Sequence, residues 1–140
     1  MGRILGVDLG SRRIGLALSD PSGTLASPLE VVARSGNAKR DRKVILAAAA
    51  EHEADTIVVG LPKSLSGKKG PAERAALEEI EALRAAAPEH VTIDMYDERF
   101  TTVIAQRGLV ESGMRRQDRK QVVDKVAAAV MLQSYLEAQS

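Results

Sequence analysis

The sequence predicts an α/β fold with a five-stranded mixed sheet, in which three antiparallel strands precede two parallel ones and helices flank the sheet. Three apolar segments joined by tight turns open the chain, which is typical of an antiparallel meander. Helical patterns then alternate with short apolar segments, which is typical of parallel strands joined by crossover helices. The 140 residues suffice for one domain with a real core and are too few for two. We therefore expect a single domain over residues 1–140.

The first three strands are expected from apolar runs and turn residues. The runs Ile4–Val7 and Ile14–Leu18 are separated by a glycine-bearing turn, so we expect them to be neighbours at the centre of the sheet. After a turn at Pro21–Gly23, residues Thr24–Ala33 form the third expected strand. Pro28 lies inside it and cannot donate a sheet hydrogen bond, so this strand is expected at an edge.

Two helices and a buried strand are expected next. Asn37 is placed to cap a helix that extends to about Glu53. The run Asp55–Gly60 is short and apolar enough for a buried strand, and the helix before it supplies the crossover that a parallel strand needs. Pro71 fits the first position of a second helix, which is expected to end near Ala87.

The last part of the chain predicts a fifth strand over Val91–Met95 and two further helices. Thr101 or Thr102 can cap the first of these helices, which would end near Gly113. After a basic connector, Asp118 opens a capping box for a last helix that reaches almost to the C-terminus.

The composition excludes several classes of protein. Without cysteine the chain can form neither a disulfide framework nor a thiolate zinc site, which is compatible with a reducing cytoplasm. No apolar run approaches the roughly 20 residues of a membrane helix, so we expect a cytoplasmic protein with no membrane partner. The net charge of +1 requires a local basic patch for any nucleic-acid partner. An aromatic content of 2% argues against base stacking and favours contacts with the phosphate backbone.

Three acidic residues are candidates for a catalytic site. Asp8 interrupts the first apolar run, and burial of an ionised carboxylate there is costly unless a partner charge or a metal offsets it. Gly6 and Gly10 would let a ligand or another backbone approach closely. Glu98 follows the fifth strand, and Asp124 lies in the second turn of the last helix. Because ligands of such sheets bind beyond the carboxyl ends of parallel strands, we expect the three carboxylates to converge.

Three convergent carboxylates predict a hard oxygen site that binds Mg²⁺ or Mn²⁺ rather than zinc. Two such ions about 4 Å apart can activate a water and stabilise the leaving oxygen of a phosphodiester.

Each acid also has an ordinary interpretation. Glu98 could be an exposed loop charge, and Asp124 could pair with Lys120 or Lys125 on its own helix. Asp8 is harder to explain in that way.

Basic residues flank all the segments that carry these acids. They follow the first strand, occupy the loop after the fourth, adjoin Glu98 and lead into the last helix. The positions are Arg12, Arg13, Lys63, Lys68, Lys69, Arg99, Arg115, Arg116, Arg119 and Lys120. An arc of positive charge around a carboxylate site would hold a phosphate backbone without reading its sequence. A solvated surface explains Lys68 and Lys69 equally well.

Several blocks of sequence form a recognisable set. They are Gly6–Gly10, Arg13–Ala17 with Ser19 and Asp20, Ile57–Pro62, Asp97–Thr102, Lys120–Asp124 and Ala127–Tyr135. In this order and spacing, across essentially the whole chain, they closely resemble the YqgF/RuvX family. The resemblance implies an RNase H-like fold and a metal-dependent nuclease site. It also implies a role either as a Holliday junction resolvase or as a nuclease that matures the 5′ end of pre-16S rRNA.

The resemblance also assigns residues. The family's acidic triad falls on Asp8, Glu98 and Asp124 of this chain. One departure is Val122, where members of the family often have a second basic residue before the last acid. Lys120 is kept, but without a base at position 122 the phosphate contact expected there would be weaker.

Three functions remain open from the sequence. The first is a two-metal endonuclease acting on structured nucleic acid, either an rRNA precursor or branched DNA. The second is an actin-like or sugar-kinase-like ATP-binding domain, which would need two such domains, whereas 140 residues supply one. The third is a nucleic-acid or ribosome-associated module without catalysis. A junction resolvase would also need two active sites in a two-fold homodimer, which the sequence leaves undecided.

Overall fold

The structure is a computed structural model, and it describes residues 2–63, 68–98 and 116–139, with side chains described from residue 126 onward in the last segment. Five strands form one sheet in the order β3-β2-β1-β4-β5. Their bounds are Arg3–Leu9 for β1, Arg13–Ser19 for β2, Ala26–Ala33 for β3, Ala54–Leu61 for β4 and Thr92–Asp97 for β5. The first three strands pair antiparallel, and β4 lies parallel to β1 and β5. The predicted mixed sheet with a central first strand is confirmed.

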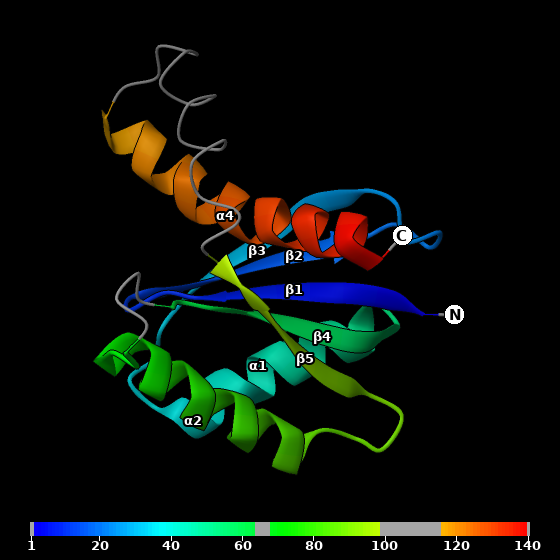
Figure 1. Ribbon diagram of the computed structural model, residues 1–140, viewed down its shortest axis with the longest axis horizontal. Coiled ribbons are helices and arrows are strands. Elements are labelled where there is room, and N and C mark those ends of the chain that lie inside the picture. Colours follow the sequence, from blue (N-terminus) through cyan, green and yellow to red (C-terminus); the bar gives the residue numbers. More distant parts are fainter. Residues whose placement is uncertain (1, 64–67, 99–115, 140) are drawn as a thin grey trace.

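Helices cover both faces of the sheet (Figure 1). Helices α1, Ala38–Glu51, and α2, Pro71–Ala86, lie on one face, and α4, Arg116–Gln139, crosses the other. Among the described helices, none combines the length and the apolar character needed to cross a bilayer.

Local signals in the sequence account for the start of two helices and for the place of one strand. The side chain of Asn37 accepts a hydrogen bond from the backbone N–H of Arg40, so Asn37 is the predicted N-cap of α1. Pro71 is the first residue of α2, where its missing N–H costs nothing. Pro28 lies in β3, which is an edge strand that pairs only with β2 in this sheet.

Several predicted boundaries are wrong, among them the end of the fifth strand, which extends to Asp97 rather than Met95. The third strand begins at Ala26 rather than Thr24, because the carboxylate of Asp20 accepts the backbone N–H groups of Thr24 and Leu25 and holds them in a turn. The last helix begins at Arg116, so Asp118 is a residue of its first turn and not its N-cap. The helix expected from Thr101 or Thr102 lies outside the described residues.

The alternation of side chains along the strands separates two hydrophobic clusters. Leu5 and Val7 of β1 pack with α1 and α2, whereas Ile4 packs against the cluster beneath α4. Gly6 therefore faces α4, and a Cβ on it would lie 2.9 Å from the Cβ of Leu132 and 3.3 Å from the carbonyl oxygen of Ala128. The close approach that was predicted at Gly6 is thus made by the backbone of a helix.

Candidate active site

Asp8 lies at the C-terminal end of the central strand β1, opposite Gly15 of β2. Successive side chains of a strand alternate between faces, so Asp8 projects to the same face as Gly6, the face that α4 covers. The residue is half-buried. Its carboxylate therefore lies beside the apolar cluster beneath α4, at the end of the sheet where β1 finishes.

Glu98 directly follows β5 and reaches toward the same place. Tyr96, two residues earlier, packs against the cluster beneath α4, which sets the face of the sheet for Glu98 as well. Between β5 and β1 lies β4, and its residue Gly60 has no side chain in the way. A Cβ at Gly60 would lie 2.9 Å from Cγ and 3.0 Å from the carboxyl carbon of Glu98, so glycine allows this side chain to cross β4 toward Asp8.

The two carboxyl groups are in contact. Burial raises the pKa of Glu98 to about 8, and a hydrogen bond to Asp8 and the negative charges of Asp8 and Asp97 add to this effect. In the protonated form Glu98 donates its carboxyl O–H to Asp8. Two acids held against each other in this way destabilise the fold unless a proton or a cation lies between them, and such pairs cluster at functional sites.

Asp124 belongs to α4, but its side chain lies outside the described residues. Its position in the helix can still be related to Gly6, because Ala128, one turn later, is fully buried and packs on that glycine. Further along the helix, Gln133 bonds to Ala26 and Thr24, at the opposite end of the sheet from Asp8. Helix α4 therefore runs from the end of the sheet where β1 finishes to the end where β1 begins.

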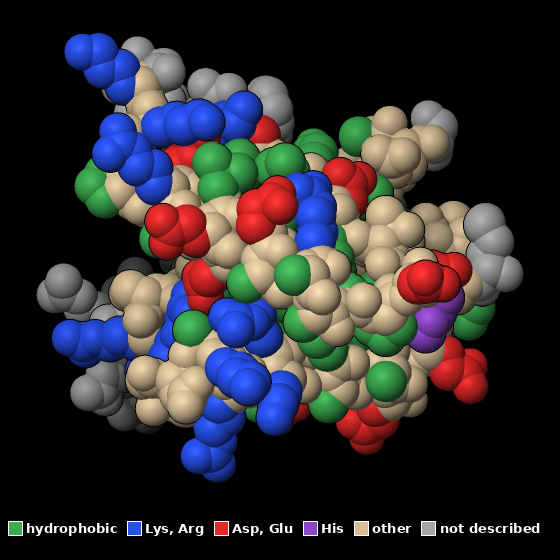
Figure 2. All heavy atoms as spheres, turned by 90° about the horizontal axis from the view of Figure 1, so that it is seen from below, with side chains coloured by type: hydrophobic (Ala, Val, Ile, Leu, Met, Phe, Trp, Pro, Cys, Tyr) green, Lys and Arg blue, Asp and Glu red, His purple; other side chains and the backbone are tan. Residues whose placement is uncertain are grey.

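The described basic residues of the predicted arc lie at the ends of strands or next to them. Arg12 is exposed in the turn after β1, Arg13 is half-buried at the start of β2, and Lys63 is exposed just beyond β4. Lys68 and Lys69 are exposed immediately before α2. Figure 2 shows the face of α1 and α2, where Lys and Arg side chains gather mainly toward the end of the molecule at which β1 finishes.

The remaining predicted basic residues are not described at the level of side chains. Arg99 and Arg115 lie outside the described residues, and so do the side chains of Arg116, Arg119 and Lys120 in α4. Among the residues that are described, no group of three acidic or histidine side chains is arranged to hold a metal. The described part of the chain thus brings two of the three predicted acids together.

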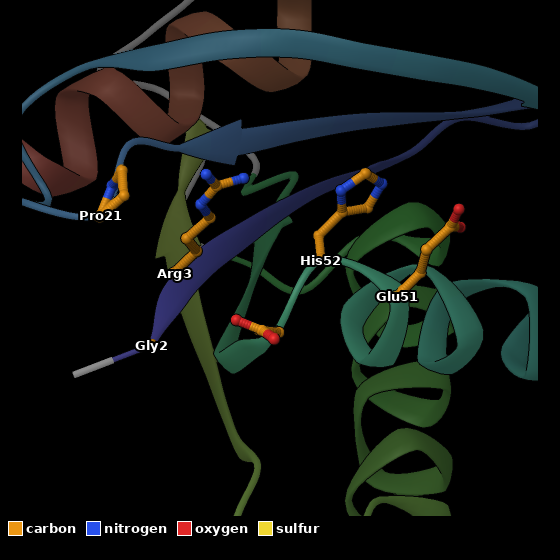
Figure 3. Close-up of a pocket in the computed structure, with 6 residues that line it drawn as sticks. Gly2, Arg3, Pro21, Glu51 and His52 are labelled. Atoms are coloured by element: carbon orange, nitrogen blue, oxygen red, sulfur yellow. The ribbon is translucent and has the colours of Figure 1, made fainter.

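A pocket of about 270 Å³ lies at the opposite end of the sheet (Figure 3). It is lined by Gly2, Arg3, Pro21, Glu51, His52 and Glu53. Arg3 is at the start of β1 and His52 is the C-cap of α1, so the pocket is separated from Asp8 by the length of the strand. Because it contains none of the predicted site residues and carries side chains of both charges, it is not the candidate active site.

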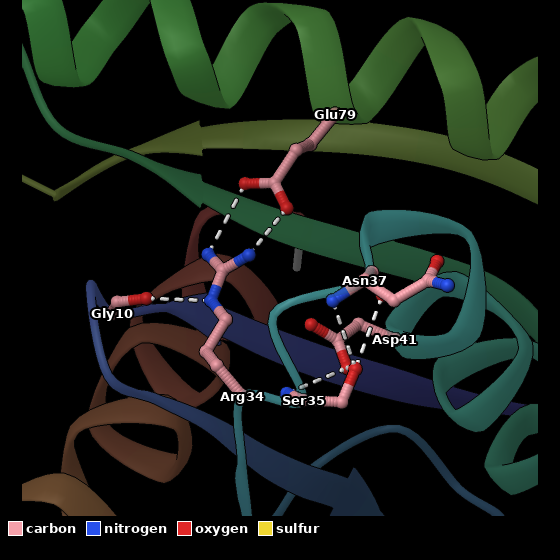
Figure 4. Close-up of polar contacts among 6 residues, drawn as sticks. All are labelled: Gly10, Arg34, Ser35, Asn37, Asp41 and Glu79. Atoms are coloured by element: carbon pink, nitrogen blue, oxygen red, sulfur yellow. Dashed lines mark hydrogen bonds and ion pairs between the residues drawn. The ribbon is translucent and has the colours of Figure 1, made fainter.

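Arg34 connects the turn that follows β1 to helix α2, which lies on the face of the sheet opposite to α4 (Figure 4). Its Nε donates to the carbonyl oxygen of Gly10 at 2.9 Å, and its two terminal nitrogens donate to the carboxylate of Glu79 in α2 at 2.6 and 3.2 Å. The bidentate pair with Glu79 raises the pKa of Arg34. Its backbone N–H also donates to the carbonyl oxygen of Arg12 at 2.9 Å. One residue therefore fixes two positions of the turn beside the acids.

Sequence reasoning missed Gly60 and Arg34 as parts of this site. A glycine inside an apolar strand does signal a close approach, but the sequence does not show that the approaching group is Glu98. Arg34 carries no local signal, because its partners Gly10 and Glu79 come from distant segments.

Comparison with known proteins gives the family. Residues 2–138 match the family model described as "RuvX: Holliday junction resolvase". This chain belongs to the RuvX family. The recognition of the family from its motif blocks is thereby confirmed, together with the nuclease class of enzyme that it implied.

Relatives agree with the RuvX assignment. The chain is 45% identical over 144 residues to a protein of Nocardia farcinica named "Putative pre-16S rRNA nuclease", covering 99% of this chain and 79% of the relative. It is 43% identical over 140 residues to a protein of Clostridium botulinum with the same name, covering 99% and 98%.

The fold resembles that of two junction resolvases. RuvC of Thermus thermophilus in complex with a Holliday junction substrate matches with a TM-score of 0.62 at 18% identity, over 99% of this chain and 96% of that one. The fowlpox virus Holliday junction resolvase matches with a TM-score of 0.55 at 10% identity, over 99% of both chains. The predicted RNase H-like fold is confirmed by this likeness.

Proposed function

We propose that the protein is a metal-dependent endonuclease that hydrolyses phosphodiester bonds in structured nucleic acid, with Asp8, Glu98 and Asp124 as its acidic residues. The observation that carries the proposal is the contact between Asp8 and Glu98, which come from separate strands and meet across Gly60. A structural role does not account for two carboxyl groups in contact, because burial and the neighbouring Asp8 oppose ionisation of Glu98. The substrates suggested by the names of the relatives and of the family model are pre-16S rRNA and the Holliday junction, a four-way DNA junction.

The donor set fits a divalent cation. Asp8 and Glu98 present carboxylate oxygens only, which suits Mg²⁺ or Mn²⁺, and a cation would offset the burial and the negative charge of Asp8 that raise the pKa of Glu98. Asp124, one helical turn before the alanine that packs on Gly6, is the proposed third ligand. When bound, the cation would supply Lewis-acid activation and neutralise charge on the cleaved phosphate.

The chain's own groups have distinct parts in this scheme. Asp8 orients the site from the rigid central strand, and Glu98 reaches the same place across Gly60 from the end of β5. Exposed basic residues at the same end of the sheet bind the phosphate backbone and position it over the acids. The proposed set is Arg12, Arg13, Lys63, Lys68, Lys69, Arg99, Arg115, Arg116 and Lys120.

The two candidate substrates differ in what they require of the assembly. Symmetric cleavage of a four-way junction needs two active sites, and hence a two-fold homodimer, whereas cleavage of a single rRNA strand needs one. The substrate and the oligomeric state are therefore tested together.

The test is a cleavage assay on a four-way DNA junction and on a precursor rRNA fragment, run side by side with Mg²⁺ and with Mn²⁺. We expect cleavage of at least one substrate by the wild-type protein and a loss of at least about 1,000-fold in Asp8→Asn, with binding retained. Asp20→Asn is the matched control, because this aspartate lies at the other end of the sheet. Cleavage that survives in Asp8→Asn or in excess chelator would contradict the proposal, and wild-type binding without cleavage would indicate a non-catalytic module.

A further inference from the structure

The first half of α1 carries four basic residues that the proposed site does not use. We call them the basic α1 surface: Lys39, Arg40, Arg42 and Lys43. Three of them are exposed and Arg42 is half-buried, while Asp41 and Ile45 form the buried side of the helix. Among the described residues, no ion pair is found for these four side chains, whereas Arg34 and Arg84 pair with acids of α2. The basic α1 surface is therefore largely exposed to solvent, and those ion pairs do not neutralise its charge.

The charge of α1 opposes the helix dipole. The N-terminal end of a helix carries partial positive charge and favours acids, and the C-terminal end favours bases. Helix α1 has one acid in its first turn, the buried Asp41, but its four exposed or half-buried cations lie in the first two turns, its last residue is Glu51 and its last turn has no base. Lys39 and Lys43 also lie one turn apart on the same side, where like charges repel. The arrangement lowers the stability of the helix, so a role other than stability is indicated.

The neighbouring helix α2 shows the ordinary arrangement. Like α1 it has an acid in its first turn, Glu73, but it has a single base, Arg74, in its first two turns and ends with Arg84 in its last turn, as the dipole favours. Both helices pack on the same face of the sheet and both follow strands that end near the candidate site. The reversal is therefore a property of α1 and not of this layer of the fold.

The basic α1 surface begins at the same end of the sheet as Asp8. Strands β1 and β3 both run antiparallel to β2, so they finish at the same edge, and α1 starts a few residues after β3. The backbone N–H of Arg34, next to the end of β3, donates to the carbonyl oxygen of Arg12. In the view of Figure 2, basic side chains gather mainly at this end.

We propose that the basic α1 surface binds the phosphate backbone of the duplex that flanks the cleaved bond. The inference rests on the proposed nuclease function and extends its nucleic-acid contacts beyond the loops at the strand ends. Lys39 and Lys43 are separated by about 6 Å along the helix axis, so both can contact one nucleic-acid strand. Lysine and arginine side chains on a solvent-facing helix contact phosphates and read no sequence.

The test measures binding without cleavage. Fluorescence anisotropy in EDTA follows a labelled four-way DNA junction and a labelled RNA hairpin over a range of salt concentrations. The variant replaces Lys39, Arg40 and Lys43 together by Gln. We expect an affinity at least about tenfold lower at 0.1 M salt and a plot of log K against log salt that is shallower by about 2, because each lost phosphate contact removes about 0.9 from the slope.

Two further variants separate this effect from misfolding and from general loss of charge. Lys39→Glu with Arg40→Glu places acids in the first turn of α1, where they favour the helix, so we expect unfolding stability at or above wild type together with weaker binding. Arg84→Gln removes a base from the far end of α2, and we expect unchanged affinity and slope. Cleavage, measured separately with Mg²⁺, should show a raised KM with an unchanged kcat in the Gln variant.

The outcomes distinguish this proposal from the nuclease function. Wild-type affinity and salt slope in the Gln variant would overturn the role of the basic α1 surface while leaving the nuclease function intact. Absence of wild-type binding to both probes at low salt would also overturn it. Salt-dependent binding that is weakened in the variant, in a protein that cleaves neither substrate, would support the surface and contradict the nuclease.

Discussion

Carboxylates at the two ends of the sheet have opposite surroundings. Asp20, after β2, accepts hydrogen bonds from Ser22 Oγ, Thr24 Oγ1 and the backbone N–H groups of Thr24 and Leu25, which hold its pKa well below the usual range. Glu98, at the end where β1 and β5 finish, meets the acid Asp8 and has a pKa raised to about 8. An acid kept for structure is surrounded by donors. An acid held against another acid indicates a site whose natural partner is a cation.

After the loss expected in Asp8→Asn, the largest effect is expected from closing the gap through which Glu98 reaches Asp8. Gly60→Ala would place a Cβ 2.9 Å from Cγ of Glu98, so the side chain must move. A shift of about 1 Å at a catalytic group can lower the rate about 100-fold, and we expect kcat to fall by about 10- to 100-fold. Steady-state cleavage kinetics measure this. Gly70→Ala is the matched control, because a Cβ there meets nothing within 4 Å, and an equal loss in both variants would contradict the account.

The next effect concerns the turn that follows Asp8. Arg34→Ala removes the bonds to Gly10 and Glu79, and we expect a loss of about 1–3 kcal/mol in the free energy of unfolding. Chemical denaturation measures it, and a double-mutant cycle with Glu79→Ala isolates the pair.

The control for Arg34 is the more exposed pair of Arg84 and Glu81, for which we expect about 0–1 kcal/mol. The Arg34 side chain is 22% exposed and that of Arg84 is 39% exposed. Equal coupling energies for the two pairs would show that Arg34 does no more than an ordinary surface residue.

A third effect is the pH dependence of stability that Glu98 confers. Its folded-state pKa of about 8 lies above the reference value of 4.5, so the folded protein binds more protons than the unfolded chain between these values. The contribution of Glu98 to stability is therefore present at low pH and is lost as pH rises through about 8. In EDTA we expect Glu98→Gln to flatten this part of the profile and to be more stable than wild type at alkaline pH. Denaturation midpoints from pH 4.5 to 9 test this, and a profile identical to wild type would contradict it.

The smallest effect is expected from Asp20, with the opposite sign. Its pKa is lowered in the folded state, so its contribution is present above the reference value of 3.8 and is lost as pH falls below it. Asp20→Asn should lower stability at neutral pH and converge with wild type in acid. Denaturation from pH 2 to 7 measures this difference. If Asp20→Asn lost stability mainly at alkaline pH, the result would contradict the opposite pKa shifts of Asp20 and Glu98.

Much of the fold could be predicted because its signals are local. Asn37 and Pro71 mark helix starts, and Pro28 marks an edge strand, through groups within a few residues of each. The misassigned strand start at Thr24 shows the limit, because a side chain four residues away competes for the backbone N–H groups.

The site was predictable where one residue broke a pattern. Asp8 interrupts an apolar strand, so its contact with another group could be expected from the sequence. The roles of Gly60 and Arg34 could not be predicted, because they depend on contacts with groups from other elements of the fold. Asp124 and the bases of the last helix remain predictions.

The central claim is that Glu98, in contact with Asp8, holds a proton that a divalent cation replaces. Calorimetric titration of the protein with Mn²⁺ at pH 7, in two buffers of different ionisation enthalpy, counts the protons released on binding. Since the pKa of Glu98 is about 8, we predict release of about one proton by wild type and close to none by Glu98→Gln. Absence of Mn²⁺ binding, or the same proton count in both proteins, would contradict the account.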